Sequence, residues 1–230
     1  MRAYNAFREE RIELSSYLSQ RPEERRRSKE LGLKEHLLER SVILSFAQTR
    51  PIIGFAAWSN TGKTTFITKL VQVLKAKGIE ASLIKHHGHG DFNLASKDST
   101  RYMQAGVQEI IAASDSSYIQ LRSNTGCPSL FELAELCDKN CPLILVEGFK
   151  RERFSKFFIS RKAHNDTTEN PPIFSPQELG WPGFLGLITD DDKDRSSYAK
   201  AAIPSFDLDD TALVASYIEL LLKAYRHRTY

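Results

Sequence analysis

Residues 52–65 read IIGFAAWSNTGKTT, and this stretch decides the fold. Its first six residues are apolar or small, which predicts a short buried strand. From Lys63 to Lys77 apolar residues recur on one helical face, and Gly78 is suited to end that helix. Gly62 and the residues after it match the end of the phosphate-loop pattern, in which Gly-Lys-Ser/Thr follows a glycine and four free residues. A strand, this loop and a helix in succession predict a binding site for a nucleoside triphosphate.

The predicted loop can surround a polyanion because successive backbone N–H groups in a tight turn form an anion-binding concavity. The helix that begins near Lys63 adds unpaired N–H groups and the positive end of its dipole. Gly62 lets the phosphates approach without a Cβ in the way, although Ala57 stands where the pattern has its first glycine. We assign to nucleotide binding the residues Trp58, Ser59, Asn60, Thr61, Gly62, Lys63, Thr64 and Thr65.

An acidic residue is expected at the end of a second buried strand, where it can hold Mg²⁺ together with the loop hydroxyl. Leu143 to Val146 are apolar, and Glu147 follows them. Lys63 would stabilise charge in the transition state, while Thr64 and Glu147 would place the metal ion, so these three are the predicted catalytic residues. The acid in such folds is more often Asp, and Glu147 could be an ordinary strand-end residue. No residue stands out as a catalytic base, which favours slow hydrolysis.

The chain after residue 51 alternates between strand and helix patterns. Strands are expected at residues 81–84, 109–113, 142–146 and 184–188, with weaker candidates at 118–121 and 157–160. Helices are expected at residues 99–105, 129–136 and 209–225, and residues 162–180 read as a polar, proline-rich loop. In the second helix, Ser129 and Glu132 form a capping-box pattern. This order predicts an α/β P-loop NTPase fold, which is a mostly parallel sheet with helices on both faces.

The N-terminal segment, residues 1–48, differs in composition from the rest of the chain. Residues 1–50 contain 11 Arg or Lys and 8 Glu, which accounts for the whole formal net charge of +3. Ser19 is a candidate cap for a helix entered through Pro22, and apolar residues recur near helical spacing up to Val42. No strand is expected here. The sequence therefore predicts a charged helical extension over 1–48 and a P-loop nucleotide-binding domain over 49–230.

Charge and hydropathy exclude several classes of protein. The neutral balance of the chain beyond residue 50 lacks the basic footprint of a nucleic-acid-binding domain. No apolar run approaches the roughly 20 residues that a membrane helix needs, and the N-terminus lacks the apolar stretch of a signal peptide. The three cysteines lack the usual zinc spacing, which favours reduced thiols. We expect a cytoplasmic protein that binds neither nucleic acid nor membranes.

Several segments, in order along the chain, resemble the molybdopterin-guanine dinucleotide biosynthesis adaptor protein (MobB) family. AAWSNTGKTT at 56–65 is similar to that family's phosphate loop, and LVEGFK at 145–150 to its Val-Glu-Gly-Phe-Lys segment. The other similar segments are LIKHH at 83–87, KDS at 97–99, AG at 105–106 and TD at 189–190. The similarity runs from residue 51 to about 224. Asn60 replaces a frequent glycine and the histidine loop is shifted, but Asn tolerates left-handed backbone, so we expect binding to survive.

The resemblance implies a GTP-binding adaptor protein with weak Mg²⁺-dependent GTPase activity. It implies a role in converting the molybdopterin cofactor to its guanine dinucleotide form, beside a molybdopterin guanylyltransferase, and it implies a homodimer. The preference for GTP over ATP is likewise implied by the resemblance alone. Two other functions stay open from the residues. One is a small-molecule kinase whose lid could use Arg151, Arg153 and Arg161, and the other is a scaffold that binds nucleotide without hydrolysing it.

The segment after the strand at 81–84 carries candidate site residues. Lys85 and His86 stand at the carboxyl end of that strand, where they could meet phosphate or pterin groups. The alternative is a transition-metal site made by His86, His87, His89 and Asp91, since imidazole suits such metals. A polar loop with no direct role is the third possibility.

Three other groups are candidates for the same site. Lys97, Asp98 and Arg101 could close over the nucleotide, bind the anionic pterin, or begin an exposed helix. Asp190 could accept two hydrogen bonds from guanine, with the next two aspartates or a solvated turn as alternatives. The basic residues of 150–153 could contact phosphate or a partner, or be solvated.

Overall fold

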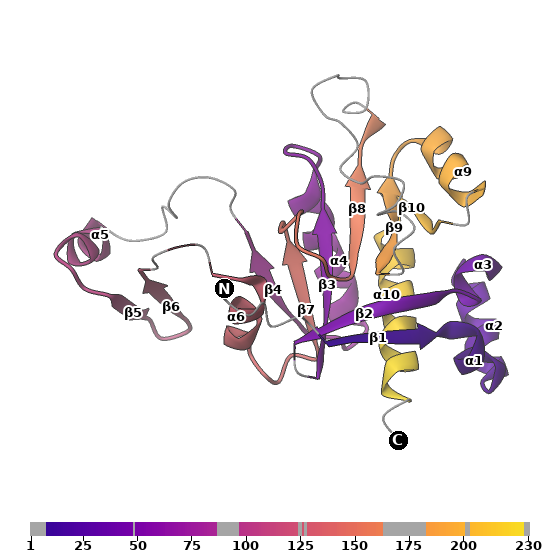
Figure 1. Cartoon of the computed structure of the whole chain (residues 1–230), viewed down its shortest axis with the longest axis horizontal. Helices are drawn as coiled ribbons and strands as arrows, with labels where there is room; N and C mark the ends of the chain where they lie inside the picture. The colour runs from indigo at the N-terminus through magenta and orange to yellow at the C-terminus, as the bar shows by residue number, and fades with distance from the viewer. Residues whose placement is uncertain are drawn as a thin grey trace, which may run out of the picture.

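The computed structural model describes residues 8–47, 49–86, 97–123, 126, 128–162, 183–200 and 203–227 (Figure 1). Parallel strands form the body of one sheet. They are β3 (Arg50–Ala56), β4 (Ala81–Lys85), β7 (Leu143–Glu147), β8 (Lys156–Ser160), β9 (Phe184–Thr189) and β10 (Ser205–Asp207). Their order across the sheet is β4-β7-β3-β8-β9-β10. The predicted α/β fold with a mostly parallel sheet is confirmed.

Helices cover both faces of this sheet, as expected. They are α4 (Lys63–Ala76), α6 (Leu130–Leu136), α9 (Asp192–Lys200) and α10 (Thr211–Arg226). α4 and α10 pack on the face that carries Ile53 and Phe55, whereas α6, capped by Ser129 and Glu132 as predicted, packs on the face of Ile52. Because helices cover both faces, β3, β7 and β9 consist wholly of buried residues and show no alternation of buried and exposed positions. None of the helices in the described ranges is long and apolar enough to span a membrane.

The N-terminal extension joins the same sheet, which the sequence analysis did not predict. It contains β1 (Arg8–Glu13), α1 (Leu14–Ser19), α2 (Pro22–Glu30), α3 (Glu35–Leu38) and β2 (Ser41–Ala47). β1 pairs antiparallel with β2, and β2 pairs antiparallel with the start of β3. α2 begins at Pro22 as predicted, but its N-cap is Arg21, and Ser19 is the last residue of α1.

Tertiary packing explains why these two strands were missed. β2 reads SVILSFA and buries Val42 and Phe46 completely, so the prediction of helical spacing up to Val42 was wrong at its end. The Phe46 ring lies 4.3 Å from that of Tyr225 in α10, measured between centroids. β1 reads REERIE, in which Ile12 is the buried residue, and such a charged segment shows no strand pattern until a partner strand is present.

The neighbour of β3 changes along one edge of the strand. Its residues up to Ile52 pair with β2, and its residues from Gly54 pair with β8. Two buried serines join these neighbours: the N–H of Ser45 donates to Ser155 Oγ at 2.7 Å, and the N–H of Ser155 donates to Ser45 Oγ at 3.0 Å. The Gly54 N–H donates to the Ser155 carbonyl at 2.8 Å. The extension is thereby attached to the strand that carries the phosphate loop.

One group of elements lies apart from the sheet, as Figure 1 shows. It contains α5 (Lys97–Gln104), β5 (Glu109–Ala113) and β6 (Tyr118–Arg122). All three elements were expected, but β5 does not extend the parallel sheet. It pairs antiparallel with β6 in a separate two-stranded sheet, and most residues of both strands are exposed. We call this group the hairpin lobe.

Gly54→Ala is expected to destabilise the fold, because the new Cβ would lie 2.5 Å from Cε2 of Phe154 and 3.2 Å from Cβ of Lys156. Overpacking of this kind costs about 1–3 kcal/mol, which urea denaturation would measure as a lower free energy of unfolding. Adding Phe154→Leu should recover part of the loss, since it removes the clashing ring carbon. A Gly54→Ala protein as stable as the wild type would contradict the close approach at this position.

Candidate nucleotide-binding site

The loop between β3 and α4 is a tight turn that ends at a helix N-terminus. Asn60 and Gly62 have φ angles of 63° and 79°, in the left-handed region that Gly favours and Asn tolerates. The Thr61 hydroxyl donates to the Trp58 carbonyl at 2.9 Å. Gly62 is the N-cap of α4 and has no side chain to cap it, so the first N–H groups of the helix are left to a ligand. Asn60 therefore fits where the family has glycine.

Lys63, the first residue of α4, bends back over the loop. Its Nζ donates to the Trp58 carbonyl at 3.3 Å. Burial lowers the pKa of the Lys63 ammonium, Glu147 raises it, and Lys150 and Lys85 lower it further. Phosphate groups would offset both the burial and the repulsion between the lysines. Lys63 is therefore suited to bind a polyanion.

Glu147 lies where β7 meets the start of α4. The Thr64 hydroxyl donates to Glu147 Oε1 at 2.9 Å, and Lys85 Nζ lies 3.6 Å from Oε2. The strand register produces this arrangement, because Glu147 is opposite Phe55 in β3 and opposite Lys85 in β4. The carboxylate is nearly buried. A hydroxyl and a carboxylate side by side match the one or two protein oxygens that a nucleotide-bound Mg²⁺ needs.

The turn after β7 is held in a strained conformation. Gly148 and Phe149 have φ angles of 103° and 48°, and for a residue such as Phe149 this backbone costs about 1–3 kcal/mol. Lys156, almost fully buried, donates from Nζ to the carbonyls of Phe149 and Lys150, each at 3.3 Å, and to that of Glu152. This lysine is not among the residues predicted from the sequence. Its signal is a lysine at the start of the apolar run KFFIS.

Positive charge gathers around the loop. Lys150 Nζ lies 4.6 Å from the centre of the Trp58 ring, and burial lowers the pKa of this ammonium. Lys63 and Lys85 approach from α4 and β4. Glu147, Lys85 and Lys150 all act electrostatically on Lys63, so three lysines face one carboxylate and leave an excess of positive charge for a ligand. The basic turn at 150–153 thus contributes one side chain to the edge of the loop.

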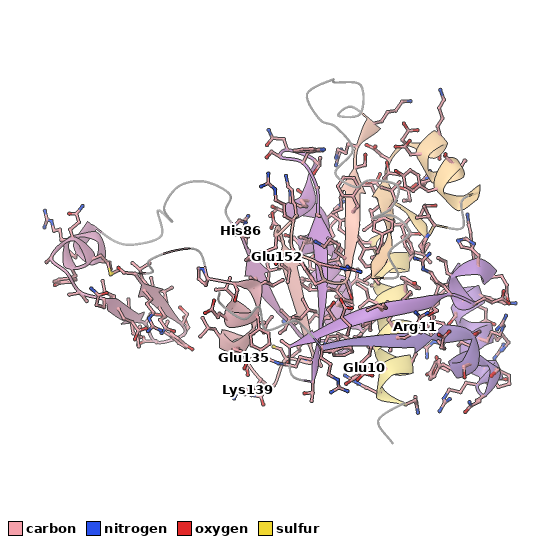
Figure 2. The ribbon with its side chains drawn as sticks, viewed as in Figure 1. Glu10, Arg11, His86, Glu135, Lys139 and Glu152 are labelled. Atoms are coloured by element: carbon pink, nitrogen blue, oxygen red, sulfur yellow. The ribbon has the colours of Figure 1, made fainter. Side chains whose placement is uncertain are left out.

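His86 lies just beyond the end of β4 (Figure 2). Its N–H donates to the Glu147 carbonyl at 2.9 Å, and its ring lies 4.4 Å from that of Phe149, measured between centroids. His87, His89 and Asp91 lie outside the described residues, so the transition-metal alternative stays a prediction. Within the described part of the chain, no three His, Cys, Asp or Glu side chains are grouped to hold a metal.

Asp190 and Arg161 border the loop from the other side. Arg161 follows β8, and its Nε donates to the Thr61 carbonyl at 2.8 Å. Asp190 follows β9, accepts a hydrogen bond at 2.8 Å from the Lys162 N–H, and lies 3.9 Å from Arg161 Nη1. The sequence suggests a role for Arg161 solely in the lid of the alternative kinase function. Its proximity to the loop depends on the pairing of β8 with β3, which no local pattern reveals.

The predicted site residues thus fall into two groups. One group lies at one end of the sheet and consists of the loop residues 58–65, Lys85, His86 and Glu147. Asp190 lies beside this group through Arg161. Lys97 and Asp98 begin α5 in the hairpin lobe, which Figure 1 shows apart from the loop.

The chain is similar in sequence to a described family and to named proteins. Residues 52–174 match the family described as molybdopterin guanine dinucleotide synthesis protein B. The molybdopterin-guanine dinucleotide biosynthesis adapter protein of Escherichia coli strain K12 is 38% identical over 115 residues, which are 48% of this chain and 66% of that protein. The adapter protein of Haemophilus influenzae is 36% identical over 114 residues, covering 49% and 64%. The chain thus matches slightly less than two thirds of the length of these relatives.

Solved structures agree in fold. Bacillus subtilis MobB superposes with a TM-score of 0.56 at 23% identity, covering 74% of this chain and 98% of that one. A structure titled molybdopterin-guanine biosynthesis protein B superposes with a TM-score of 0.53 at 19% identity, covering 73% and 97%. These likenesses identify a P-loop NTPase fold. The family match spans more than half of the residues of this chain, and the chain therefore belongs to the molybdopterin guanine dinucleotide synthesis protein B (MobB) family.

Proposed function

We propose that this protein is a GTP-binding adaptor that hydrolyses GTP slowly with Mg²⁺ and assists the conversion of molybdopterin cofactor to its guanine dinucleotide form. The observation that carries the proposal is the meeting of Lys63, Thr64 and Glu147 at the start of α4. Trp58 to Thr65 surround the phosphates, and the positive end of the α4 dipole faces them.

Each group at the loop has a distinct task. Lys63 neutralises charge that develops on the transferred phosphoryl group, and Thr64 and Glu147 hold Mg²⁺. The Glu147 oxygens face Thr64 and Lys85, so this carboxylate is poorly placed to take a proton from water. Slow hydrolysis follows. The bound metal ion would neutralise the phosphate oxygens, and the protein supplies the positioning.

The strand order supports a place for the base. Asp190 follows β9, the second strand beyond β3 on the side away from β7. Its carboxylate can accept from the guanine N1–H and the exocyclic amine. Lys85 and His86 are assigned to the phosphate side, since they lie next to Glu147. Lys97 and Asp98, in the hairpin lobe, are assigned to the anionic pterin or a partner and not to the nucleotide.

The adaptor role is supported by the relatives, which are named biosynthesis adapter proteins. We propose a molybdopterin guanylyltransferase as the partner and the cytoplasm as the location. The hairpin lobe supports a homodimer. Tyr118 and Ile111 are 72% and 64% exposed, and the strand register places both on one face of the lobe. A hairpin alone is marginally stable in water, so a second copy is the proposed cover.

Lys63→Ala is expected to weaken binding of GTP with Mg²⁺ by at least about tenfold, because a charge-assisted contact to phosphate contributes about 1.5–3 kcal/mol. Isothermal titration calorimetry would measure the dissociation constant. Lys69→Ala is the matched control, since this exposed lysine lies on the same helix. In a competition assay against a fluorescent guanine nucleotide, GTP should displace the probe and ATP should not. Unchanged affinity in Lys63→Ala would remove the basis of the proposal.

The variant Ile111→Lys with Tyr118→Lys is expected to convert a dimer to a monomer, because charges would replace apolar contacts on one face of the hairpin lobe. Sedimentation equilibrium would measure the mass. Glu80→Lys, which changes an exposed charge before β4, serves as the control and should leave the dimer intact. A wild-type protein that is already monomeric, or a double variant that stays dimeric, would contradict this assignment of the interface.

A further inference from the structure

Arg161 is a charged residue at the loop to which the proposed function gives no task. Its side chain crosses the loop from β8, with Nε donating to the Thr61 carbonyl at 2.8 Å. A Cβ placed on Gly62 would lie 2.9 Å from Arg161 Nη2, so the guanidinium rests directly on this glycine. The side chain is 40% exposed. The guanidinium is thus held against the phosphate loop with one side open to solvent.

Asp190 forms an ion pair with the guanidinium. Its Oδ2 lies 3.9 Å from Arg161 Nη1, while its Oδ1 accepts the Lys162 N–H. A carboxylate has about four lone-pair sites, so Asp190 can direct Arg161 and still accept from a base. An arginine already placed by a hydrogen bond at Nε and an ion pair at Nη1 loses less conformational freedom when it binds an anion.

The sheet order tells which part of a nucleotide lies near Arg161. The predicted metal ligands Thr64 and Glu147 mark the β7 side of β3, and Mg²⁺ bridges the β- and γ-phosphates. Arg161 and Asp190 mark the β8 and β9 side. The chain leaves β3 for β4 on one side and later returns to β8 on the other, so the crevice between β3 and β8 is where this fold binds ligands. The nucleoside end therefore extends toward Arg161.

We propose that Arg161 binds the α-phosphate of the nucleotide and that Asp190 positions its guanidinium. This inference rests on the proposed function and extends it, because it assigns the nucleoside side of the site to the ends of β8 and β9. Arg161 provides N–H donors and a permanent positive charge on the side of the loop away from Mg²⁺. The phosphate chain is then bound at both ends, by the metal ligands and by Arg161.

The experiment measures dissociation constants of the full chain for GTP, GDP and pyrophosphate, each with Mg²⁺. Arg161→Ala is expected to weaken the binding of GTP and of GDP by the same factor, about tenfold. The affinity for pyrophosphate should stay unchanged, since pyrophosphate occupies just the β- and γ-phosphate subsites. Arg161→Lys should recover part of the affinity because it keeps the charge. Arg161→Gln, which can still donate to the Thr61 carbonyl, should behave like Arg161→Ala.

Other outcomes would overturn the assignment. A loss of affinity for GTP without a loss of affinity for GDP would place Arg161 at the terminal phosphate. If Arg161→Gln keeps the wild-type affinity for GTP, or if Arg161→Ala loses as much affinity for pyrophosphate as for GTP, Arg161 acts by shaping the loop. No change in any constant would mean that Arg161 does not contact the nucleotide. Lys63→Ala in the same series separates the two proposals, because failure of nucleotide binding at the loop would show as unchanged GTP affinity in that variant.

Discussion

The parallel pairing of β7 with β3 is the constraint on which the candidate site depends. In this register Glu147 stands opposite Phe55, two residues before the loop begins, and its carboxylate meets the first turn of α4. A shift of one residue would turn the side chain to the other face of the sheet. Because β3 and β7 are buried along their whole length, the packing of their apolar residues against α4 and α6 fixes that register. The position of a polar group is thus determined by apolar contacts.

The same end of the sheet concentrates groups that would be unfavourable elsewhere. Lys63 is partly buried beside other lysines, Phe149 has a left-handed backbone, and Lys156 is buried with its ammonium on backbone carbonyls. Such features destabilise a fold unless the surroundings hold them, and they gather where a ligand binds. The buried Lys156 ammonium stabilises the turn that bears Lys150. With the turn fixed, Lys150 stays over the Trp58 ring at the edge of the loop.

The N-terminal extension and the hairpin lobe differ in their relation to the parallel sheet. The N-terminal extension is part of the central core: Ile12 and Leu18 are buried in the same cluster as Leu70 of α4 and Leu221 of α10. Its stability is therefore coupled to that of the loop strand. The hairpin lobe instead exposes apolar side chains on a two-stranded sheet. The N-terminal extension thus reinforces the scaffold, whereas the hairpin lobe leaves apolar surface exposed.

The sequence by itself determined the elements that carry local signals. The phosphate loop follows from its glycine, lysine and threonine, the strand before Glu147 from its apolar run, and the parallel sheet from the alternation of strands and helices. Tertiary structure alone decided that residues 8–13 and 41–47 are strands, that 109–113 leaves the main sheet, and that Arg161 lies across Gly62. The physical reason is that strand pairing joins residues far apart in the chain. A charged segment or a lone arginine carries no mark of the neighbour that pairing will provide.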